Sequence, residues 1–199
     1  PLDDYIRELN NFTSTGLTTL NDLNKLINKD FYVGGIINEV EHLQSKTGNG
    51  FAVFSFEDFN DQYKFRIFGE EYLKFKHLLE ENKILRLRLN VRDGWVNKET
   101  GRVGDPRIQF LNIELLDGII NSNSKKITLK VDSKSIKNND ILKLKSTLTK
   151  YKGSSPVYFD IHDSKNEFKL NMISEDTKVN ISKGLLLSLE EDEFLYKLN

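Results

Sequence analysis

The chain has 199 residues, with 29 Lys and Arg against 30 Asp and Glu, so its formal net charge is −1. This balance excludes a positive electrostatic field over the whole molecule that would attract a polyanion. Any affinity for nucleic acid must therefore come from a local patch of positive charge. Hydrophobic residues make up 38% and charged residues 30% of the chain, which indicates one or two soluble globular domains. The absence of cysteine excludes disulfides, cysteine nucleophiles and cysteine-bound zinc.

No apolar run approaches the roughly 20 residues that cross a bilayer, and no signal-peptide pattern opens the chain. We therefore expect a cytoplasmic protein with no membrane partner. The chain begins at Pro1 and not at Met, so we also expect it to be a piece of a longer protein.

The first 30 residues predict a helical lead-in, too small to fold alone, in which short helical patterns are broken by the turn cluster at 13–16. Residues 31–120 predict a small β domain, because short runs of β-branched and aromatic residues are separated by Gly, Asn and Asp. Its five strands are expected at Phe31–His42, Gly50–Glu57, Gln62–Phe68, Ile84–Arg92 and Ile108–Leu116.

One helix is predicted within residues 69–83, between the third and fourth strands, from apolar residues at helical spacing with acids at the start. Five strands with a helix in that place predict an OB-fold, a partly open five-stranded Greek-key barrel. Its ligands usually cross strands two and three, under the loops that join strands 1–2 and 4–5.

The alternation of residues assigns faces to three strands. The inward rows are predicted to be Ala52, Phe54 and Phe56; Tyr63, Phe65 and Ile67; and Leu85, Leu87, Leu89 and Val91. The outward rows are Phe51, Val53 and Ser55; Lys64 and Arg66; and Arg86, Arg88, Asn90 and Arg92. Gly34-Gly35 in the first strand predicts a bulge or a bend.

A polar stretch at residues 121–126 is the predicted linker, and residues 127–199 predict a small α+β domain. In that domain we expect a strand after residue 126, a helix at Asp140–Tyr151 and a hairpin of Pro156–Asp163 with Glu167–Ser174. A further strand at 177–181 and a short helix through Leu185–Leu189 complete it.

The sequence predicts no catalytic residue, no metal site and no cofactor, and it offers no small-molecule substrate site. The three histidines are scattered, the acidic pairs lie at the ends of predicted strands and helices, and no nucleophile or phosphate-loop motif occurs. The stretch at Lys46–Gly50 is explained by a hairpin turn, since Asn-Gly supplies the backbone conformation that a tight turn requires.

Residues 83–107 carry seven basic residues and three acidic ones, together with the one tryptophan of the chain. Single-stranded nucleic acid is bound by basic grooves with aromatic rings on which bases stack. The predicted DNA-binding residues on one face are Lys46, Phe51, Lys64, Arg66, Arg92, Trp95, Lys98 and Arg102. The alternative is that Trp95 packs on a neighbouring element and the arginines pair with Glu39 and Glu41.

A family resemblance is carried by residues Gly35, Ile36, Lys46, Gly48, Ala52, Phe56-Glu57-Asp58, Phe68, Tyr72 and Leu78-Leu79. With this pattern, the run from Phe31 to Arg92 resembles the OB domain near the C-terminus of bacterial DNA polymerase III alpha subunits. The opening residues 1–5 also resemble the end of the SGHPLD motif that precedes this domain in the family. The resemblance implies structural roles for Gly48 at the turn, for Glu57-Asp58 at a strand end and for Phe68 in the barrel wall.

The resemblance further implies that the parent protein is a DNA-directed DNA polymerase, a nucleotidyltransferase of DNA replication, whose active site lies outside this chain. The segment after Lys125 is similar to the family's C-terminal tail, which in several relatives contacts the clamp-loader tau subunit. That implies a protein-docking surface, with Glu190–Glu193 as candidates; a solvated helix end is the alternative. The chain departs from many relatives after the first strand, where Glu39, Glu41 and His42 stand in place of Arg or Lys.

Two hypotheses follow. The first is a binding module whose OB domain holds single-stranded DNA without sequence specificity and in a salt-sensitive way, while the tail docks replisome partners. The second is a protein-interaction scaffold that contacts the clamp loader and binds little DNA. An OB domain of the anticodon-binding type is a third reading, and it accounts poorly for the opening motif and the tail. Fold alone decides none of these.

Overall fold

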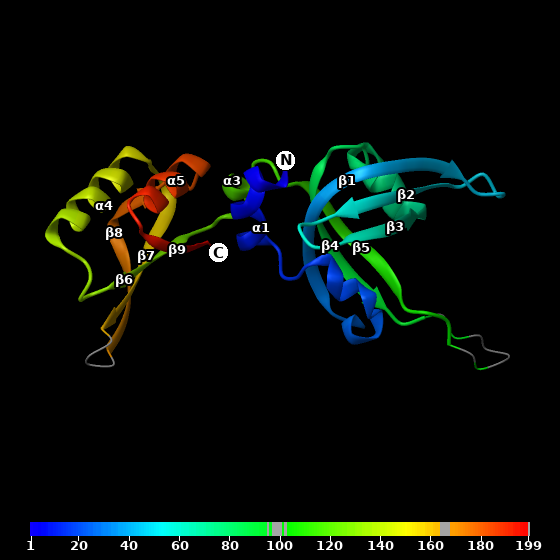
Figure 1. Ribbon diagram of the computed structural model, residues 1–199, viewed down its shortest axis with the longest axis horizontal. Helices are drawn as coiled ribbons and strands as arrows, with labels where there is room; N and C mark the ends of the chain where they lie inside the picture. Colours follow the sequence, from blue (N-terminus) through cyan, green and yellow to red (C-terminus); the bar gives the residue numbers. More distant parts are fainter. Residues whose placement is uncertain (95, 97–100, 102, 164–167, 199) are drawn as a thin grey trace. The chain divides into compact units, whose positions relative to one another are not determined.

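The computed structural model describes residues 1–94, 96, 101, 103–163 and 168–198. The chain divides into two compact units, Pro1–Asp117 and Gly118–Asn199, each with a sheet of its own (Figure 1). The predicted combination of mainly β and α+β structure is thereby confirmed. Among these residues, no helix combines the length and the hydrophobicity that a membrane crossing demands.

Short helices open the first unit because its apolar residues occur in small groups separated by turn-forming residues. They are η1 (Leu2–Tyr5), α1 (Ile6–Phe12), η2 (Leu17–Asn21) and η3 (Leu23–Leu26). Leu17 and Leu20 of η2 are buried in the same core as the strands. This part of the chain therefore contributes to the core of the first unit.

Five antiparallel strands form the first sheet, in the order β3-β2-β1-β4-β5. They are β1 (Asp30–Gln44), β2 (Gly50–Glu57), β3 (Gln62–Phe68), β4 (Ile84–Arg92) and β5 (Arg107–Leu115). The five predicted strands are confirmed, with ends displaced by at most two residues. In this order β3 and β5 are the two edge strands.

Strand β1 is 15 residues long because it serves both halves of the sheet: its first half pairs with β4 and its second half with β2. Of the bulge or bend predicted at Gly34-Gly35, the bulge is wrong, since the register is regular there and shifts between Ile37 and Glu39. Gly35 serves another purpose. A Cβ at this position would lie 2.2 Å from the backbone oxygen of Glu57, so only glycine allows β1 to approach the end of β2 so closely.

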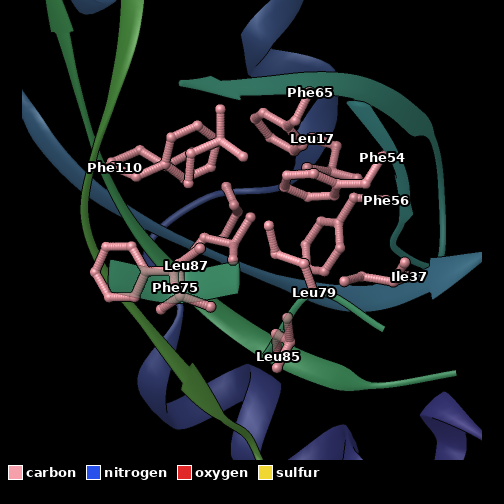
Figure 2. Packing of buried hydrophobic residues seen from close by; sticks show 14 of the residues in the cluster. Leu17, Ile37, Phe54, Phe56, Phe65, Phe75, Leu79, Leu85, Leu87 and Phe110 are labelled. Atoms are coloured by element: carbon pink, nitrogen blue, oxygen red, sulfur yellow. The ribbon is translucent and has the colours of Figure 1, made fainter. Parts of the chain in front are cut away.

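Phenylalanine rings from three strands fill the centre of the first unit (Figure 2). Phe54 and Phe65 are each 1% exposed, with their ring centroids 5.3 Å apart. Phe110 of β5 lies against them, with its centroid 5.6 Å from that of Phe65. Each such ring contributes about 1.5–3 kcal/mol through burial, so this cluster holds the three strands together.

The predicted inward rows of β2 and β4 are all buried, which confirms the facing of both strands. Two residues of the outward rows are buried as well. Ser55 accepts a hydrogen bond from Gln62, and Asn90 donates one to Asp30 at 2.6 Å. Each of these two side chains therefore makes a hydrogen bond where it is buried, although the Oδ1 of Asn90 is buried without a partner among the described residues.

The predicted helix between the third and fourth strands is present as α2 (Gly69–Phe75), followed by the single turn η4 (Lys76–Leu78). The helical structure ends at Leu78, earlier than the end of the predicted range at residue 83. Phe75 and Leu79 are buried and join the core. The helix thus packs against the sheet that holds the phenylalanine rings.

The second unit has a four-stranded sheet in the order β8-β7-β6-β9. Its elements are α3 (Ile119–Asn123), β6 (Ile127–Asp132), α4 (Asn138–Lys150), β7 (Lys152–Asp163), β8 (Phe168–Val179), α5 (Lys183–Glu191) and β9 (Leu195–Leu198). β6 and β7 are parallel, which requires a crossover connection, and α4 supplies it.

Three details of the second unit differ from the sequence analysis. Helix α3 occupies the first part of the stretch at 121–126 that is taken there as a linker. The strand expected at 177–181 is not separate, because β8 continues through to Val179. Strand β9 is not predicted: its pairing with β6 depends on contact between residues far apart in the sequence, which leaves no local signal.

Asp58 ties the lead-in to the turn between β2 and β3. Its carboxylate accepts hydrogen bonds from the backbone N–H of Leu17 at 2.7 Å and from those of Asn60 and Asp61, both at 2.8 Å. We expect Asp58→Ala to lower the free energy of unfolding by about 1–3 kcal/mol, since three backbone donors lose their acceptor. Urea denaturation measures the change. Asp176→Ala, at an exposed carboxylate in the second unit, is the control, and equal stability of the two variants would contradict the prediction.

Candidate nucleic-acid interface

The outer face of β1, β2 and β3 carries side chains in three rows that run across the strands. The rows are Leu43, Phe51 and Phe68; Glu41, Val53 and Arg66; and Glu39, Ser55 and Lys64. Because side chains alternate between the two faces of a strand, these residues share the face opposite the phenylalanine core. We call this surface the outer face.

Phe51 and Phe68 form a stacked pair at one end of the outer face. Their ring centroids are 5.1 Å apart with an interplanar angle of 22°, and Phe68 is 55% exposed. The structural role that the family resemblance implies for Phe68 is corrected here, since this ring faces outward. Strand alternation could have placed it there. Phe51 is half-buried, so the exposed ring of Phe68 is the surface on which a flat ligand ring can stack, and Phe51 supports it from beside.

The charges on the outer face are divided between its two sides. Lys64 and Arg66 are exposed on β3, whereas Glu39 and Glu41 are exposed on β1, about 10 Å away with β2 between them. Within the described part of the chain, neither Lys64 nor Arg66 has a side-chain hydrogen bond or ion pair. An anionic ligand on this face is therefore attracted to the β3 side and repelled from the β1 side.

Lys46 is exposed in the tight turn that joins β1 and β2. The turn is closed by a hydrogen bond from the Ser45 N–H to the Asn49 carbonyl at 2.8 Å, and Gly48 has a φ of +81°. Glycine is suited to this position because it adopts positive φ without steric cost. The turn follows directly on the row of Leu43 and Phe51, so Lys46 lies beyond the aromatic end of the outer face.

A pocket of about 680 Å³ lies between the edge strands β3 and β5, beside the end of β4; we call it the arginine pocket. Basic, acidic and amide side chains line it: Arg66, Arg92 and Arg107; Glu71 and Asp93; and Asn28 and Gln109. Phe68 also lines it, so the pocket adjoins the aromatic end of the outer face.

Arg92 and Arg107 stand directly opposite each other on β4 and β5. The Nε of Arg92 donates to the Oε1 of Gln109 at 3.0 Å, so a neutral amide holds this guanidinium. In the described residues, the Arg107 side chain has neither a hydrogen bond nor an ion pair within 4.0 Å. The pocket therefore contains positive charge that carboxylates do not fully compensate.

Glu71 of α2 reaches the edge of β5, where its Oε2 accepts a hydrogen bond from the Phe110 N–H at 3.1 Å. Burial raises the pKa of this carboxyl, while the Phe110 hydrogen bond and the nearby charge of Arg107 act in the opposite direction. The sequence offers no signal for this role, because the acid and its partner are 39 residues apart.

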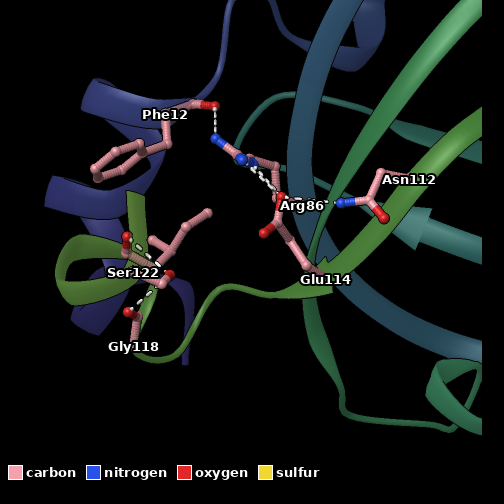
Figure 3. A network of polar contacts seen from close by, with 7 residues as sticks. Phe12, Arg86, Asn112, Glu114, Gly118 and Ser122 are labelled. Atoms are coloured by element: carbon pink, nitrogen blue, oxygen red, sulfur yellow. Dashed lines mark hydrogen bonds and ion pairs between the residues drawn. The ribbon is translucent and has the colours of Figure 1, made fainter. Parts of the chain in front are cut away.

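Arg86 is excluded from any ligand contact by its own partners (Figure 3). Its Nε and NH2 groups both donate to Oε1 of Glu114, at 3.0 and 2.6 Å, and NH1 donates to the Phe12 carbonyl at 3.3 Å. The guanidinium also lies 4.6 Å from the centre of the Tyr32 ring. These contacts make Arg86 a structural residue that ties α1 to β4.

Arg88 is likewise paired, with its NH2 group 2.8 Å from Oδ2 of Asp30. The hydrogen bonds from Asn90 and Arg88 lower the pKa of Asp30. The alternative in which the arginines pair with Glu39 and Glu41 is wrong for Arg86 and Arg88, whose carboxylate partners are Glu114 and Asp30.

Of the predicted DNA-binding residues, the structure describes Lys46, Phe51, Lys64, Arg66 and Arg92. Phe51, Lys64 and Arg66 lie together on the outer face, Arg92 lies in the arginine pocket that Arg66 also lines, and Lys46 is in the adjoining turn. Trp95, Lys98 and Arg102 lie outside the described residues. The described residues contain no group of three or more His, Asp and Glu side chains that could hold a metal ion.

In the second unit, an apolar groove of about 520 Å³ lies between α4 and the sheet. Its lining includes Ile141, Leu144 and Leu148 of α4 and Val131, Phe159 and Ile161 of β6 and β7. Ile141 is 49% exposed, and Lys145 lines the groove as well. Leu170 and Met172 of β8 pair with Ile161 and Phe159 and extend the exposed apolar surface along the same face.

The acids at 190–193 are partly engaged within the second unit. Glu190 accepts a hydrogen bond from the Tyr196 hydroxyl at 2.6 Å, and Asp192 lies 3.4 Å from the ammonium of Lys143. Both contacts fasten the end of α5 to neighbouring elements.

Comparison with known proteins identifies a family for the second unit. Residues 127–199 match the family described as DNA polymerase III alpha subunit, C-terminal domain. Over 193 residues, the chain is 21% identical to DNA polymerase III subunit alpha of Bacillus subtilis (strain 168), an alignment that covers 96% of this chain and 16% of that protein. The chain therefore spans about a sixth of the length of this relative.

A solved structure described as an aspartyl-tRNA synthetase from Leishmania major Friedlin is similar over 53% of this chain and 21% of its own, with 11% identity and a TM-score of 0.35. A likeness this weak does not bear on the function.

Glu71→Gln is expected to change how stability depends on pH. Because the pKa of Glu71 is raised above 4.5, the folded protein binds this proton more tightly than the unfolded chain does. Stability from this group is present below about pH 4.5 and is lost as the pH rises through the folded pKa. In Glu71→Gln, the glutamine still accepts the hydrogen bond from Phe110 but does not titrate. The stability of this variant relative to the natural protein should therefore rise with pH. Urea unfolding across this window measures the difference, and a constant difference would contradict the prediction.

Proposed function

The chain is a C-terminal region of a bacterial DNA polymerase III alpha subunit, and from this premise we propose that its first unit binds single-stranded DNA without sequence specificity. The observation that carries the proposal is the stacked pair of half-buried Phe51 and exposed Phe68, beside Lys64 and Arg66 on the outer face. Bases of any identity stack on aromatic rings, and cationic side chains bind the phosphates between them.

The proposal includes an OB-fold for the first unit. The strand order β3-β2-β1-β4-β5, with β1 shared by both halves and α2 between β3 and β4, supports it. An OB barrel is partly open, and here β3 and β5 are the edge strands. The outer face covers β2 and β3, which is where OB domains usually bind their ligands.

The phosphates would follow the β3 side of the outer face and not the β1 side. Lys64, Arg66 and the adjoining Arg92 attract them, whereas Glu39 and Glu41 repel them. Lys46 in the β1–β2 turn completes the proposed set together with Trp95, Lys98 and Arg102, which follow β4 in the sequence and lie outside the described residues. Affinity should fall with salt, because each neutralised phosphate of a single strand contributes a log–log slope of about −0.7.

In this proposal the chain itself is not an enzyme. The parent protein would be a DNA-directed DNA polymerase with its active site outside these residues, and this region would hold unpaired template for it. Base stacking on the outer face is the property that suits a template of changing sequence.

A second candidate function is favoured by the apolar groove of the second unit. We propose that this groove docks an apolar segment of a replisome protein, with the clamp-loader tau subunit as the partner. Monomeric proteins seldom leave a continuous apolar surface uncovered, and Lys145 at the groove suits a segment with acidic flanks. If this contact were the main function, the chain would be a scaffold that binds little DNA.

Phe51→Ala and Phe68→Ala are each expected to weaken binding of a fluorescein-labelled dT oligonucleotide by about 5- to 150-fold, the equivalent of one lost stacking contact. Lys64→Ala should reduce the salt slope by about 0.7. Fluorescence anisotropy at two salt concentrations measures both quantities.

Phe59→Ala is the matched control, since this phenylalanine is also exposed but lies in the turn between β2 and β3, off the outer face. Absence of binding by the natural chain at about 50 mM salt would reject the proposal. Equal losses for Phe51→Ala and Phe59→Ala would also reject it.

Ile141→Asp is expected to abolish capture of the clamp-loader tau subunit while leaving oligonucleotide affinity unchanged, because a carboxylate in the apolar groove opposes an apolar ligand. Leu187→Asp, at an exposed leucine of α5 outside the groove, is the control. Surface plasmon resonance with purified tau measures the affinity. Unchanged tau binding by Ile141→Asp, or loss with both variants, would contradict this docking site.

A further inference from the structure

The arginine pocket brings together cations from three different strands. Arg66 comes from β3, Arg92 from β4 and Arg107 from β5, and all three line the same cavity. A sheet disperses charge easily by pointing side chains to different faces or to solvent. Three guanidinium groups around one cavity are therefore a specific feature of this site.

The register places two of these cations in an unfavourable position. Arg92 and Arg107 are direct cross-strand partners, and like charges in that arrangement destabilise a sheet. The Arg92 Nε is held by the neutral amide of Gln109, which leaves its two amino groups available for a further acceptor. The pair thus carries a cost that a bound anion would offset.

The two acids of the pocket leave this charge partly uncompensated. Glu71 uses Oε2 to accept from the Phe110 N–H at the β5 edge, and the pocket's other acid, Asp93, follows directly on β4. In the described residues, no carboxylate oxygen lies within 4.0 Å of the Arg66, Arg92 or Arg107 guanidinium. The cations outnumber the acids and present donors in the planar geometry that suits phosphate oxygens.

We propose that the arginine pocket is a phosphate-binding subsite, in which Arg66, Arg92 and Arg107 hold one phosphate group and the Glu71 carboxylate limits the affinity. The inference deepens the proposed single-strand site and rests on it for the source of that phosphate. A volume of about 680 Å³ accommodates a small organic ligand, so a nucleotide unit enters with its phosphate. Phe68 joins the pocket to the outer face, which makes the subsite continuous with the proposed path.

Glu71 has a defined effect in this subsite. Its negative charge repels an entering phosphate and interacts with Arg107, so the site binds its ligand more weakly than the three arginines alone would. Moderate affinity suits a polymerase region from which a template must continually slide. Removing the charge while keeping the acceptor for Phe110 should therefore strengthen binding.

The test compares Arg107→Gln and Glu71→Gln with the natural chain, using fluorescence anisotropy with a labelled dT oligonucleotide. Arg107→Gln should weaken binding by about tenfold and reduce the salt slope by about 0.7, as expected for one lost phosphate contact. Glu71→Gln should strengthen binding by about fivefold. Lys178→Gln, which removes an equal charge from an exposed position of the second unit, is the control and should change neither quantity.

The source of the phosphate is resolved by two oligonucleotides, one with and one without a 5′-phosphate. An Arg107→Gln effect on both identifies an internal phosphodiester, and an effect only on the phosphorylated one identifies a strand end. If the natural chain binds both oligonucleotides and the Arg107→Gln and Glu71→Gln variants bind them with the same affinity, the phosphate-binding subsite is overturned while the proposed function stands.

A second measurement separates the subsite from the proposed function. Inorganic pyrophosphate should raise the melting temperature of the natural chain and raise that of Glu71→Gln further, by mass action on the folded state, and should not do so for Arg107→Gln. If the natural chain binds no oligonucleotide, the proposed function fails, while a pyrophosphate shift of this pattern still supports the subsite. If pyrophosphate shifts the melting temperature of neither the natural chain nor Glu71→Gln, the phosphate-binding subsite is overturned.

Discussion

The alternation of side chains on β2 and β3, fixed by the phenylalanine core, is the constraint on which the rest of the first unit depends. Phe54, Phe56 and Phe65 are buried together, and the period of a strand is two residues. Phe51 and Arg66 must then point to the opposite face. A slip by one residue would carry cations into the core, where burying an unpaired charge is too costly. Core packing and the proposed binding surface thus result from one register.

The arginines of β4 and β5 differ in their neighbours, and these neighbours determine which of them have a structural role and which line the arginine pocket. Arg86 is fastened by Glu114 and by the Phe12 carbonyl, and Arg88 by Asp30. Arg92 and Arg107, at the other end of the same strand pair, line a pocket whose acids only partly compensate them. Since guanidinium groups are charged at every physiological pH, the difference lies in the neighbours and not in the residues.

The five strands of the first sheet, the helix after β3 and the outward direction of Lys64 and Arg66 could be predicted, because each rests on a local pattern of alternation or helical spacing. The roles of Glu71 and Arg107 could not. Glu71 acts through a hydrogen bond to Phe110, and the Arg92–Arg107 pair is visible only once the register between β4 and β5 is known. Strand β9 escaped prediction for the same reason, since β6 supplies its pairing.

The sequence by itself determined where the strands of the first unit lie, which face of β2 and of β4 is apolar and that any affinity for an anion must be local, because these follow from composition and from periodicities of a few residues. The tertiary structure alone decided that Phe51 and Phe68 stack, which arginines are paired, and that three strands converge on one pocket. The physical reason is that such contacts join residues distant along the chain, and only the packed core sets their distances.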